Sequence, residues 1–472
     1  MASGCAGLAP TVAALSDRCM QRETSAAMSV AEDDSMCRPD RPRGRPLRNI
    51  SPRVSLQLVS SKIMRLLLLL LPTAIAAWKL ATGARLPGSP RHSTATTTGG
   101  SILDLAAVEQ WCTANGLKER HLFNVYRHLF QRDGEFTADS LHEDAEVPLK
   151  HATALCGHFS GGVTTSKIVS RVPSEGGLKL VVELASGHRI ETVLIFHDHV
   201  SSGRSRSTVC VSSQVGCARA CSFCATGTMG LRANLGAAEV LEQVWHARRE
   251  APEGYDVRNV VFMGMGEPLD NMEVLLDTLR GLTHQALFGL SAKQLTVSTV
   301  GASPEKIRRL ADEAPRVRLA LSLHSATLPL RAQLIPSATS MEELNAALDY
   351  HAHTTRCGLM VEYLLIHDVN DRDCDADALA AFCAERTVAA LATTPSDAPL
   401  SKKAARAATG YVNLIPFNPT EAGSQHGYST PSDEAVERFH ARLRDEHGVN
   451  ALIRWTSAVG RDANGACGQL VV

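Results

Sequence analysis

Short apolar runs alternate with amphipathic stretches through the C-terminal half of the chain. The runs are brief and continuously apolar, which predicts buried strands, and between them apolar residues recur every three or four positions, which predicts helices. The predicted strands cover residues 257–263, 294–299, 318–323, 359–366 and 411–416, and the predicted helices include 237–249, 272–282 and 341–353. Strand followed by helix, repeated about six times, predicts parallel strands with right-handed crossovers. We therefore expect an α/β fold whose sheet closes fully or partly into a barrel, with functional side chains at the carboxyl ends of the strands.

Two further patterns precede this region. Residues 102–159 carry apolar residues at helical spacing, which predicts a small helical domain. Residues 179–195 hold two β-rich runs joined by Ala-Ser-Gly-His, which predicts a hairpin that leads to a first core strand at 208–213. The expected division is a leader (1–100), a helical domain (101–160), a hairpin linker (161–206) and a core domain (207–472).

The leader differs in composition from the rest of the chain. An apolar run, residues 66–78, is shorter than the roughly 20 residues that a membrane-spanning helix needs, so we expect no stable membrane association. Preceded by Arg65 and followed by an Arg-, Ser- and Thr-containing stretch without acidic residues (79–98), it resembles a signal segment joined to a transit peptide, with Met64 as a start. The pattern favours an organelle, a plastid rather than a mitochondrion; a cytoplasmic protein with an untargeted leader is the alternative.

The overall charge identifies no partner. Lys and Arg number 48 against 49 Asp and Glu, and 44% hydrophobic and 21% charged residues are typical of globular proteins. An RNA enzyme of this charge needs a local basic face, because the phosphate interaction depends on where Lys and Arg lie. One candidate face surrounds the second apolar stripe of the helical domain, although a merely solvated helix surface explains it equally well. Its residues are Lys118, Arg120, His121, Arg127, His128 and Arg132.

Three of the 13 cysteines stand at metal-ligand spacing: Cys217, Cys221 and Cys224 form Cys-x3-Cys-x2-Cys. Disulfide frameworks belong to short secreted chains, so this clustering favours a reducing compartment. Thiolates are the usual ligands of iron-sulfur clusters, and three of them leave one iron open. Zinc is the alternative, but a structural zinc site needs a fourth protein ligand, and no second Cys-x2-Cys pair or His-x3-His lies at suitable spacing.

In this motif the chain resembles the radical S-adenosylmethionine (SAM) superfamily, whose cysteine loop follows the first strand of a partial (βα)6 barrel. It further resembles the RlmN/Cfr family of RNA adenine methyltransferases from about residue 165 onward. Three ordered motifs carry this resemblance: Cys-Val-Ser-Ser-Gln-Val-Gly-Cys at 210–217, Met-Gly-Met-Gly-Glu-Pro-Leu at 263–269, and Ala-Cys-Gly-Gln-Leu at 466–470. The fold class expected is a partial (βα)6 radical SAM barrel with a small N-terminal helical domain and a β-hairpin extension.

The resemblance implies two cofactors, a [4Fe-4S] cluster on the three cysteines and SAM bound to its open iron, with two SAM molecules used per turnover. Glycines after a buried strand let the backbone approach a ligand closely, and Glu267 offers an acceptor for the methionine ammonium. By resemblance the SAM pocket comprises Gly266, Glu267, Ser298, Ser322, Leu323, His324 and Asn418. Taken alone, His324 is more typical of a core histidine.

Two further cysteines and one glutamate complete the implied chemistry. By resemblance, one SAM methylates Cys467, and a 5'-deoxyadenosyl radical made from a second SAM takes a hydrogen from that methyl group, so that the resulting carbon radical adds to an adenine. The base is then joined to the protein through a thioether. Cys210 is the candidate for breaking this link, with disulfide formation, because thiolates attack sulfur readily, and Glu191 matches the family's proton acceptor. Cys210 as a packing residue and Glu191 as a solvated strand residue are the alternatives.

The function expected is methylation of carbon 2 of an adenosine in large-subunit ribosomal RNA, with transfer RNA as a further substrate. A low-potential donor such as flavodoxin or ferredoxin would supply electrons to a monomeric enzyme. Methylation at carbon 8 is the alternative within the family, and Val215, where a cysteine is absent, favours carbon 2. Outside the family, the motifs would also suit a radical SAM enzyme acting on a non-RNA substrate or an iron-sulfur electron carrier.

Two features outside the motifs complete the predictions. An Ala-, Thr-, Pro- and Ser-rich stretch, 387–410, interrupts the last strand-helix unit and is interpreted as a flexible insertion; its basic residues leave an RNA contact open. The remaining cysteines of the core domain, Cys357, Cys374 and Cys383, lie in helical or apolar runs and are expected to pack.

Overall fold

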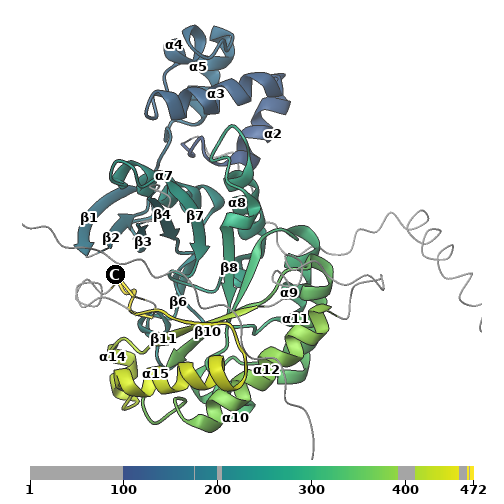
Figure 1. Ribbon diagram of the computed structural model, residues 1–472. Coiled ribbons are helices and arrows are strands. Elements are labelled where there is room, and N and C mark those ends of the chain that lie inside the picture. The colour runs from purple at the N-terminus through teal and green to yellow at the C-terminus, as the bar shows by residue number, and fades with distance from the viewer. Residues whose placement is uncertain (1–98, 175, 199–204, 392–409, 456–464, 467) are drawn as a thin grey trace, which may run out of the picture. The chain divides into compact units, whose positions relative to one another are not determined.

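A ten-stranded sheet in the order β1-β2-β3-β4-β7-β8-β9-β10-β11-β12 organises the protein (Figure 1). The computed structural model describes residues 99–472 except 175, 199–204, 392–409, 456–464 and 467, all within one compact unit, His92–Val472. The targeting leader that we predict lies outside the described residues. No helix in the described part of the chain has the length and apolar character to cross a membrane.

The core strands run parallel and stand side by side in chain order. They are β4 (Arg206–Cys210), β7 (Val257–Phe262), β8 (Leu295–Thr299), β9 (Arg318–Ser322), β10 (Met360–Leu365) and β11 (Tyr411–Pro416). The strand order is linear among the described residues, so the sheet curves without closing. The partial barrel predicted from the alternation is confirmed, and each predicted core strand matches an observed one within a few residues.

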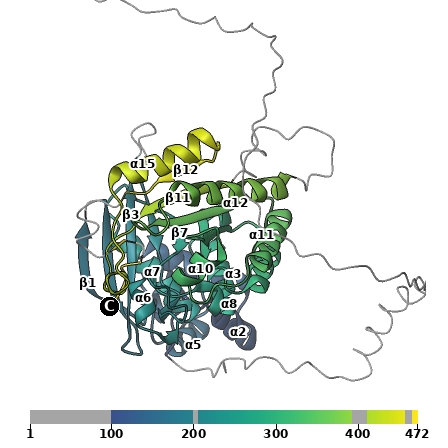
Figure 2. The same ribbon diagram turned by 90° about the horizontal axis from the view of Figure 1, so that it is seen from below.

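Helices cover the outside of this sheet. They are α7 (Ala237–Glu250), α8 (Met272–Thr283), α9 (Pro304–Glu313), α10 (Leu328–Leu334), α11 (Met341–Thr355), α12 (Asp373–Leu391) and α15 (Asp433–Ala441). Neighbours pack on one another around the curve, α7 on α8, α9 on α11 and α11 on α12 (Figure 2). In α8, for example, the side turned to the sheet is an apolar stripe that includes Leu275, Leu279 and Leu282.

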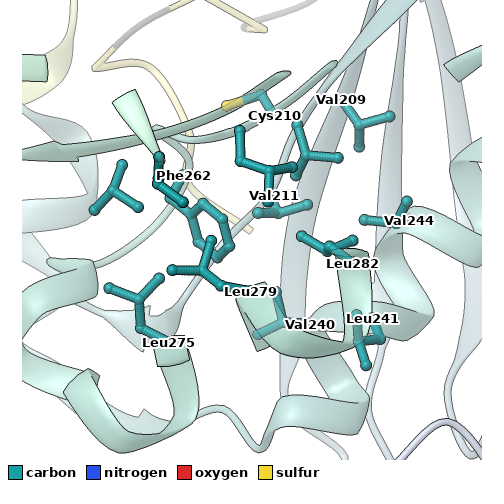
Figure 3. Close-up of a cluster of buried hydrophobic side chains, with 14 of the residues drawn as sticks. Val209, Cys210, Val211, Val240, Leu241, Val244, Phe262, Leu275, Leu279 and Leu282 are labelled. Carbon is teal, nitrogen blue, oxygen red and sulfur yellow. The ribbon is translucent and has the colours of Figure 1, made fainter. Parts of the chain in front are cut away.

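Side chains of β4, and of Val211 directly after it, alternate between these helices and the barrel interior. Val209 and Val211 pack beside Val240 and Val244 of α7, whereas the sulfur of Cys210 points the other way (Figure 3). Successive strand residues face opposite sides, so the two valines hold β4 while Cys210 is directed inward. Cys210 is nevertheless buried, with 8% of its surface exposed.

An antiparallel extension adjoins β4. The predicted hairpin is present as β2 (Gly177–Glu183) and β3 (Arg189–His197), and β3 pairs with β4. Two edge strands were not predicted: β1 (Lys167–Ser174) and, at the other edge, the short parallel strand β12 (Ala451–Ile453). Strand β1 is a polar edge strand with a proline, and β12 is very short, so neither carries a strong strand pattern.

The N-terminal described segment is helical, as its periodicity predicts. Its helices are α2 (Leu105–Asn115), α3 (Glu119–Gln131), α4 (Ala138–Glu143) and α5 (Leu149–His158). Phe130 of α3 packs edge-on against Trp245 of α7 and against Phe288, which ties this segment to the barrel. The basic face needs one correction. His128 is buried because it lies on the same side of α3 as Val125 and Leu129, so it cannot contact RNA phosphates.

Two other predictions are corrected within the described residues. Helix α12 continues to Leu391, so the start of the predicted flexible insertion, 387–391, is helical, because its Thr-Val-Ala-Ala-Leu sequence extends the preceding Ala-rich helix. The remainder, 392–409, lies outside the described residues. Cys374 does not pack: it is exposed near the start of α12.

The remaining elements are short. They are β5 (Gln214–Gly216), β6 (Leu231–Asn234), α6 (Ala225–Thr228), η1 (Pro268–Asn271), η2 (Ala292–Gln294), α14 (Glu421–Gln425) and η3 (Arg442–Glu446). Strands β5 and β6 form a separate two-stranded sheet that brackets the cysteine loop. The loop is therefore held at both ends.

Candidate active site

A cavity of about 920 Å³, including its open mouth, lies at the carboxyl ends of the core strands. Most of the predicted site residues line it, namely Cys217, Cys221, Cys224, Gly266, Glu267, Ser298, Ser322 and His324. Leu323, Asn418, Cys210 and Glu191 are absent from its lining, and Cys467 lies outside the described residues.

Backbone geometry sets the entrance to the cysteine loop. Gly216 has φ +76°, and a Cβ there would overlap the carbonyl oxygen of Gly230. That carbonyl accepts a hydrogen bond from the amide of Cys217 at 3.1 Å. Glycine is required because only it combines a positive φ with so close an approach.

The three thiols fit a cluster better than a single ion. Burial raises the pKa of Cys217 to about 12 and raises the pKa of Cys221 and Cys224, so ionising them together calls for a bound cation. Zinc ligands at 2.3 Å would bring sulfurs to roughly 3.8 Å from one another. In the described part of the chain, only His367, Asp368 and Asp371 bring three ligand atoms within 4.8 Å of one another, so at least two of the three cysteine sulfurs are farther apart than that. This spacing is wider than one zinc ion allows and suits ligands at separate corners of a cubane.

Glu267 presents a buried carboxylate at the cavity wall. Gly266, with φ +104°, turns the chain, and the Glu267 amide donates to Gln214 Oε1 at 2.9 Å. Its carboxylate accepts from the amides of Leu269 (3.3 Å) and Val300 (3.0 Å). Burial raises the pKa of Glu267, and no basic side chain pairs with it among the described residues. A ligand ammonium would supply the missing positive charge.

Hydroxyl and imidazole groups complete the opposite wall. Ser298 and Ser322 hold their Oγ atoms 3.3 Å apart. His324, at φ +56°, accepts the Leu364 amide on Nδ1 at 3.0 Å, so its proton resides on Nε2 and can be donated to a ligand. Burial lowers the pKa of His324 to about 3, which keeps the ring neutral.

The two pocket residues that do not line the cavity are both deeply buried. Leu323 contributes its backbone, whose amide donates to the Glu362 carbonyl at 3.0 Å. Asn418 follows β11, and its Nδ2 has no hydrogen-bond partner within the described residues. A buried amide without a partner is costly, which is consistent with a donor that awaits a ligand.

Glu191 and Cys210 occupy adjacent strands. The register of β3 and β4 pairs Val193 with Cys210, two residues beyond Glu191. Glu191 is 1% exposed and accepts from Lys179 Nζ at 2.9 Å, which excludes the solvated-strand alternative. Burial raises the pKa of Glu191, while Lys179 and the amide of Val471 oppose the rise.

The segment that follows Cys467 rests on the cysteine loop. The Ala225 amide donates to the Gly468 carbonyl at 2.8 Å, and Thr226 Oγ1 donates to the Leu470 carbonyl at 2.6 Å. With the contact between Val471 and Glu191, the C-terminal residues thus connect the cysteine loop to the predicted proton acceptor.

Comparisons with known proteins agree with this geometry. Residues 211–380 match the model of the radical SAM superfamily. A probable dual-specificity RNA methyltransferase RlmN from Thermotoga neapolitana is 37% identical over 376 residues, which cover 78% of this chain and 97% of that protein. The ribosomal RNA large subunit methyltransferase N of Nitrosopumilus maritimus is 37% identical over 65% of this chain and 81% of its own length.

The chain belongs to the RlmN family. It is a radical SAM methyltransferase whose cofactors are a [4Fe-4S] cluster and SAM. The crystal structure of a radical SAM methyltransferase from Sphaerobacter thermophilus also matches, with a TM-score of 0.65 and 34% identity over 79% of this chain and 99% of that one. RlmN-family membership therefore rests on sequence and fold together.

A buried carboxylate is among the cavity residues of this RlmN-family chain that were not predicted. Glu362 lies inward on β10, and its Oε1 accepts from Asn413 Nδ2 at 2.7 Å. Burial raises the pKa of Glu362 to about 7. The sequence indicated this residue through a carboxylate inside an otherwise apolar predicted strand, because glutamate is almost never fully buried unless it is paired.

We predict that the Glu267→Gln variant binds SAM about 10- to 100-fold more weakly than the native RlmN-family enzyme. Glutamine keeps the shape but loses the charge, and a hydrogen bond to a charged group contributes about 1.5–3 kcal/mol. Equilibrium binding of SAM to the cluster-loaded protein measures the effect. Glu273→Gln, an exposed change on α8, is the control. An unchanged dissociation constant for Glu267→Gln would remove this residue from the SAM site.

Proposed function

We propose that this protein methylates carbon 2 of an adenosine in large-subunit ribosomal RNA, with transfer RNA as a further substrate. The names of its relatives, a dual-specificity RNA methyltransferase and a ribosomal RNA methyltransferase, support an RNA substrate. The observation that carries the proposal is the buried Glu191 beside the Cys210 strand, linked to the C-terminal segment. An electron carrier would have no use for this arrangement.

The residues suit the difficulty of the reaction. Carbon 2 of adenine is electron-poor and carries a hydrogen, so direct transfer of a methyl cation to it is unfavourable. When bound, the cluster and SAM supply a methyl group and a carbon-centred radical. In this proposal Cys467 holds the methyl carbon and becomes joined through it to the base. Glu191 then accepts the ring proton, and its contact with Lys179 favours the ionised form that can do so.

Release of the product falls to Cys210. Its sulfur faces the barrel interior, the side from which a linked base would be presented (Figure 3). Once the ring proton has gone to Glu191 and the adduct has lost its unpaired electron, which the oxidised cluster would accept, attack by this thiolate on the Cys467 sulfur forms a disulfide bond and breaks the sulfur–carbon bond. The released methylene carbon keeps the electron pair of that bond and takes up a proton to become the methyl group. Buried thiols resist ionisation, so an acceptor is needed for the Cys210 proton.

Methylation at carbon 8 is the second candidate, and isotope labelling separates it from carbon 2. We expect RNA carrying deuterium at adenine carbon 2 to lose that deuterium in the methylated product, while RNA labelled at carbon 8 retains it. Mass spectrometry of nucleosides from ribosomal and transfer RNA, incubated with the complete enzyme, measures both. Loss of deuterium from carbon 8 would assign the methylation to carbon 8 instead of carbon 2. Absence of any methylated adenosine would reject an RNA adenine substrate.

A further inference from the structure

Arg331, on α10, is a completely buried arginine beneath the cavity. Its guanidinium donates to backbone carbonyls at the ends of two core strands. Nη1 contacts the carbonyls of Ser322, at 3.0 Å, and Leu323, and Nη2 contacts that of Val300. The side chain thus joins the carboxyl ends of β8 and β9, the edge at which the cavity opens.

No carboxylate pairs with Arg331 in the described part of the chain, and its Nε has no hydrogen-bond partner there. Arg219, in the cysteine loop, differs: its Nε donates to Asp270 Oδ2 at 2.8 Å and its Nη2 donates to Oδ1. Burying a charge without a partner costs free energy, so a buried arginine normally pairs with a carboxylate or another negative group. Among the described residues, the partners of Arg331 are carbonyl dipoles, which compensate its positive charge only in part.

The cysteine loop lies against the same helix. The amide of Ser222 donates to the Leu334 carbonyl at 3.0 Å, where α10 ends. Arg331 precedes Leu334 by three residues, and residues at that spacing are neighbours on a helix. The buried guanidinium therefore lies one helical turn from the point where α10 contacts Ser222, the residue next to Cys221.

We propose that Arg331 is the buried counter-charge of the iron-sulfur cluster, a positioning residue that raises the cluster's reduction potential. Three thiolates outweigh the positive charge of the cubane core, and reduction adds a further negative charge. A fixed cation in a low-dielectric interior stabilises the reduced state more than the oxidised one. The inference rests on the cluster ligands proposed above, Cys217, Cys221 and Cys224.

The test is a redox titration of the cluster, followed by electron paramagnetic resonance, in the full-length protein. We compare the native enzyme with Arg331→Met, Arg331→Gln and Arg331→Lys, and use the exposed Arg316→Met as the control. At the native midpoint, the ratio of reduced to oxidised cluster should fall at least tenfold in the Met and Gln variants, which is a shift of about 59 mV for one electron. Arg331→Lys and Arg316→Met should stay within about twofold of the native ratio.

Every other outcome is decisive. A native-like potential in Arg331→Met or Arg331→Gln would overturn the proposal, as would equal shifts in the Lys and Met variants. If both neutral variants fail to fold even without iron, Arg331 serves the backbone carbonyls alone and the proposal also fails. Iron content and the absorbance of the native protein are measured first. A native protein that takes up no four-iron cluster would reject the proposed ligands themselves, which separates that failure from a failure of the counter-charge.

Discussion

The Cys467→Ala variant is expected to form no methylated RNA while it continues to cleave SAM. Alanine has no sulfur to hold the methyl carbon, so the link between SAM and the base is lost. The cysteine loop and Glu267, which line the cavity and which we propose as cofactor ligands, are unchanged in this variant. The measurement is twofold: transfer of labelled methyl groups to RNA, and 5'-deoxyadenosine formed under reducing conditions. We expect the first to fall by at least about 1,000-fold, as when a covalent group that acts as part of a unit is removed.

Cys374→Ala is the matched control for this experiment. Cys374 is exposed near the start of α12, so its replacement removes a thiol without opening a cavity. It should methylate RNA at the native rate. Unchanged methylation by Cys467→Ala would sink the methyl-carrier mechanism, and loss of SAM cleavage together with methylation would indicate damage to the cofactor site instead.

The Cys210→Ala variant is expected to accumulate protein covalently joined to RNA. Without this thiol the link between Cys467 and the base forms but is not broken, because no other cysteine shares the inward side of β4. Denaturing gel electrophoresis with labelled RNA should show up to one linked RNA per protein molecule, and mass spectrometry should place the link on Cys467. Turnover should fall to a single event.

A packing role for Cys210 predicts a different result. Removing one buried sulfur would then lower the free energy of unfolding by roughly 1 kcal/mol without any adduct, since small cavities have small costs. Cys210→Ser, which nearly preserves volume, would restore turnover under the packing role but not under the proposed one. Unchanged turnover by Cys210→Ala, without any adduct, rules out the role of Cys210 in breaking the link to the base.

The Glu191→Gln variant tests the proposed proton acceptor. Without the carboxylate the ring proton is not removed, so the adduct formed with deuterated RNA should retain deuterium at the methylated carbon.

Local sequence patterns predicted most of the fold and many of the residues that line the candidate site. The parallel strands were recognisable because a strand buried on both faces must be apolar along its whole length, as in β8 and β10. The cavity residues follow from short motifs at strand ends, such as Gly266 and Glu267, where chain order already implies position. Edge strand β1 escaped prediction because its half-exposed residues need no apolar pattern.

Burial was the property that the sequence left open. His128 appeared to belong to a basic face and is in the interior, and Cys374 appeared to be a packing residue and is exposed. His128 shares the apolar side of α3 with Val125 and Leu129, so the packing of that side carried the histidine into the interior. The sides of α12, which holds Cys374, are chemically similar, so only its contacts with neighbouring elements decided which side was covered.

By itself, the amino-acid sequence determined the chemistry available to this protein: a cysteine triad for a cluster, a Gly-Met-Gly-Glu turn for SAM and two more cysteines in ordered motifs. Only the tertiary structure decided which charges are buried and what faces them. It pairs Glu191 with Lys179, directs Glu362 into the cavity and gives Arg331 no carboxylate partner among the described residues. The physical reason is that charge interactions act through space and depend on burial, neither of which is recorded in the order of residues.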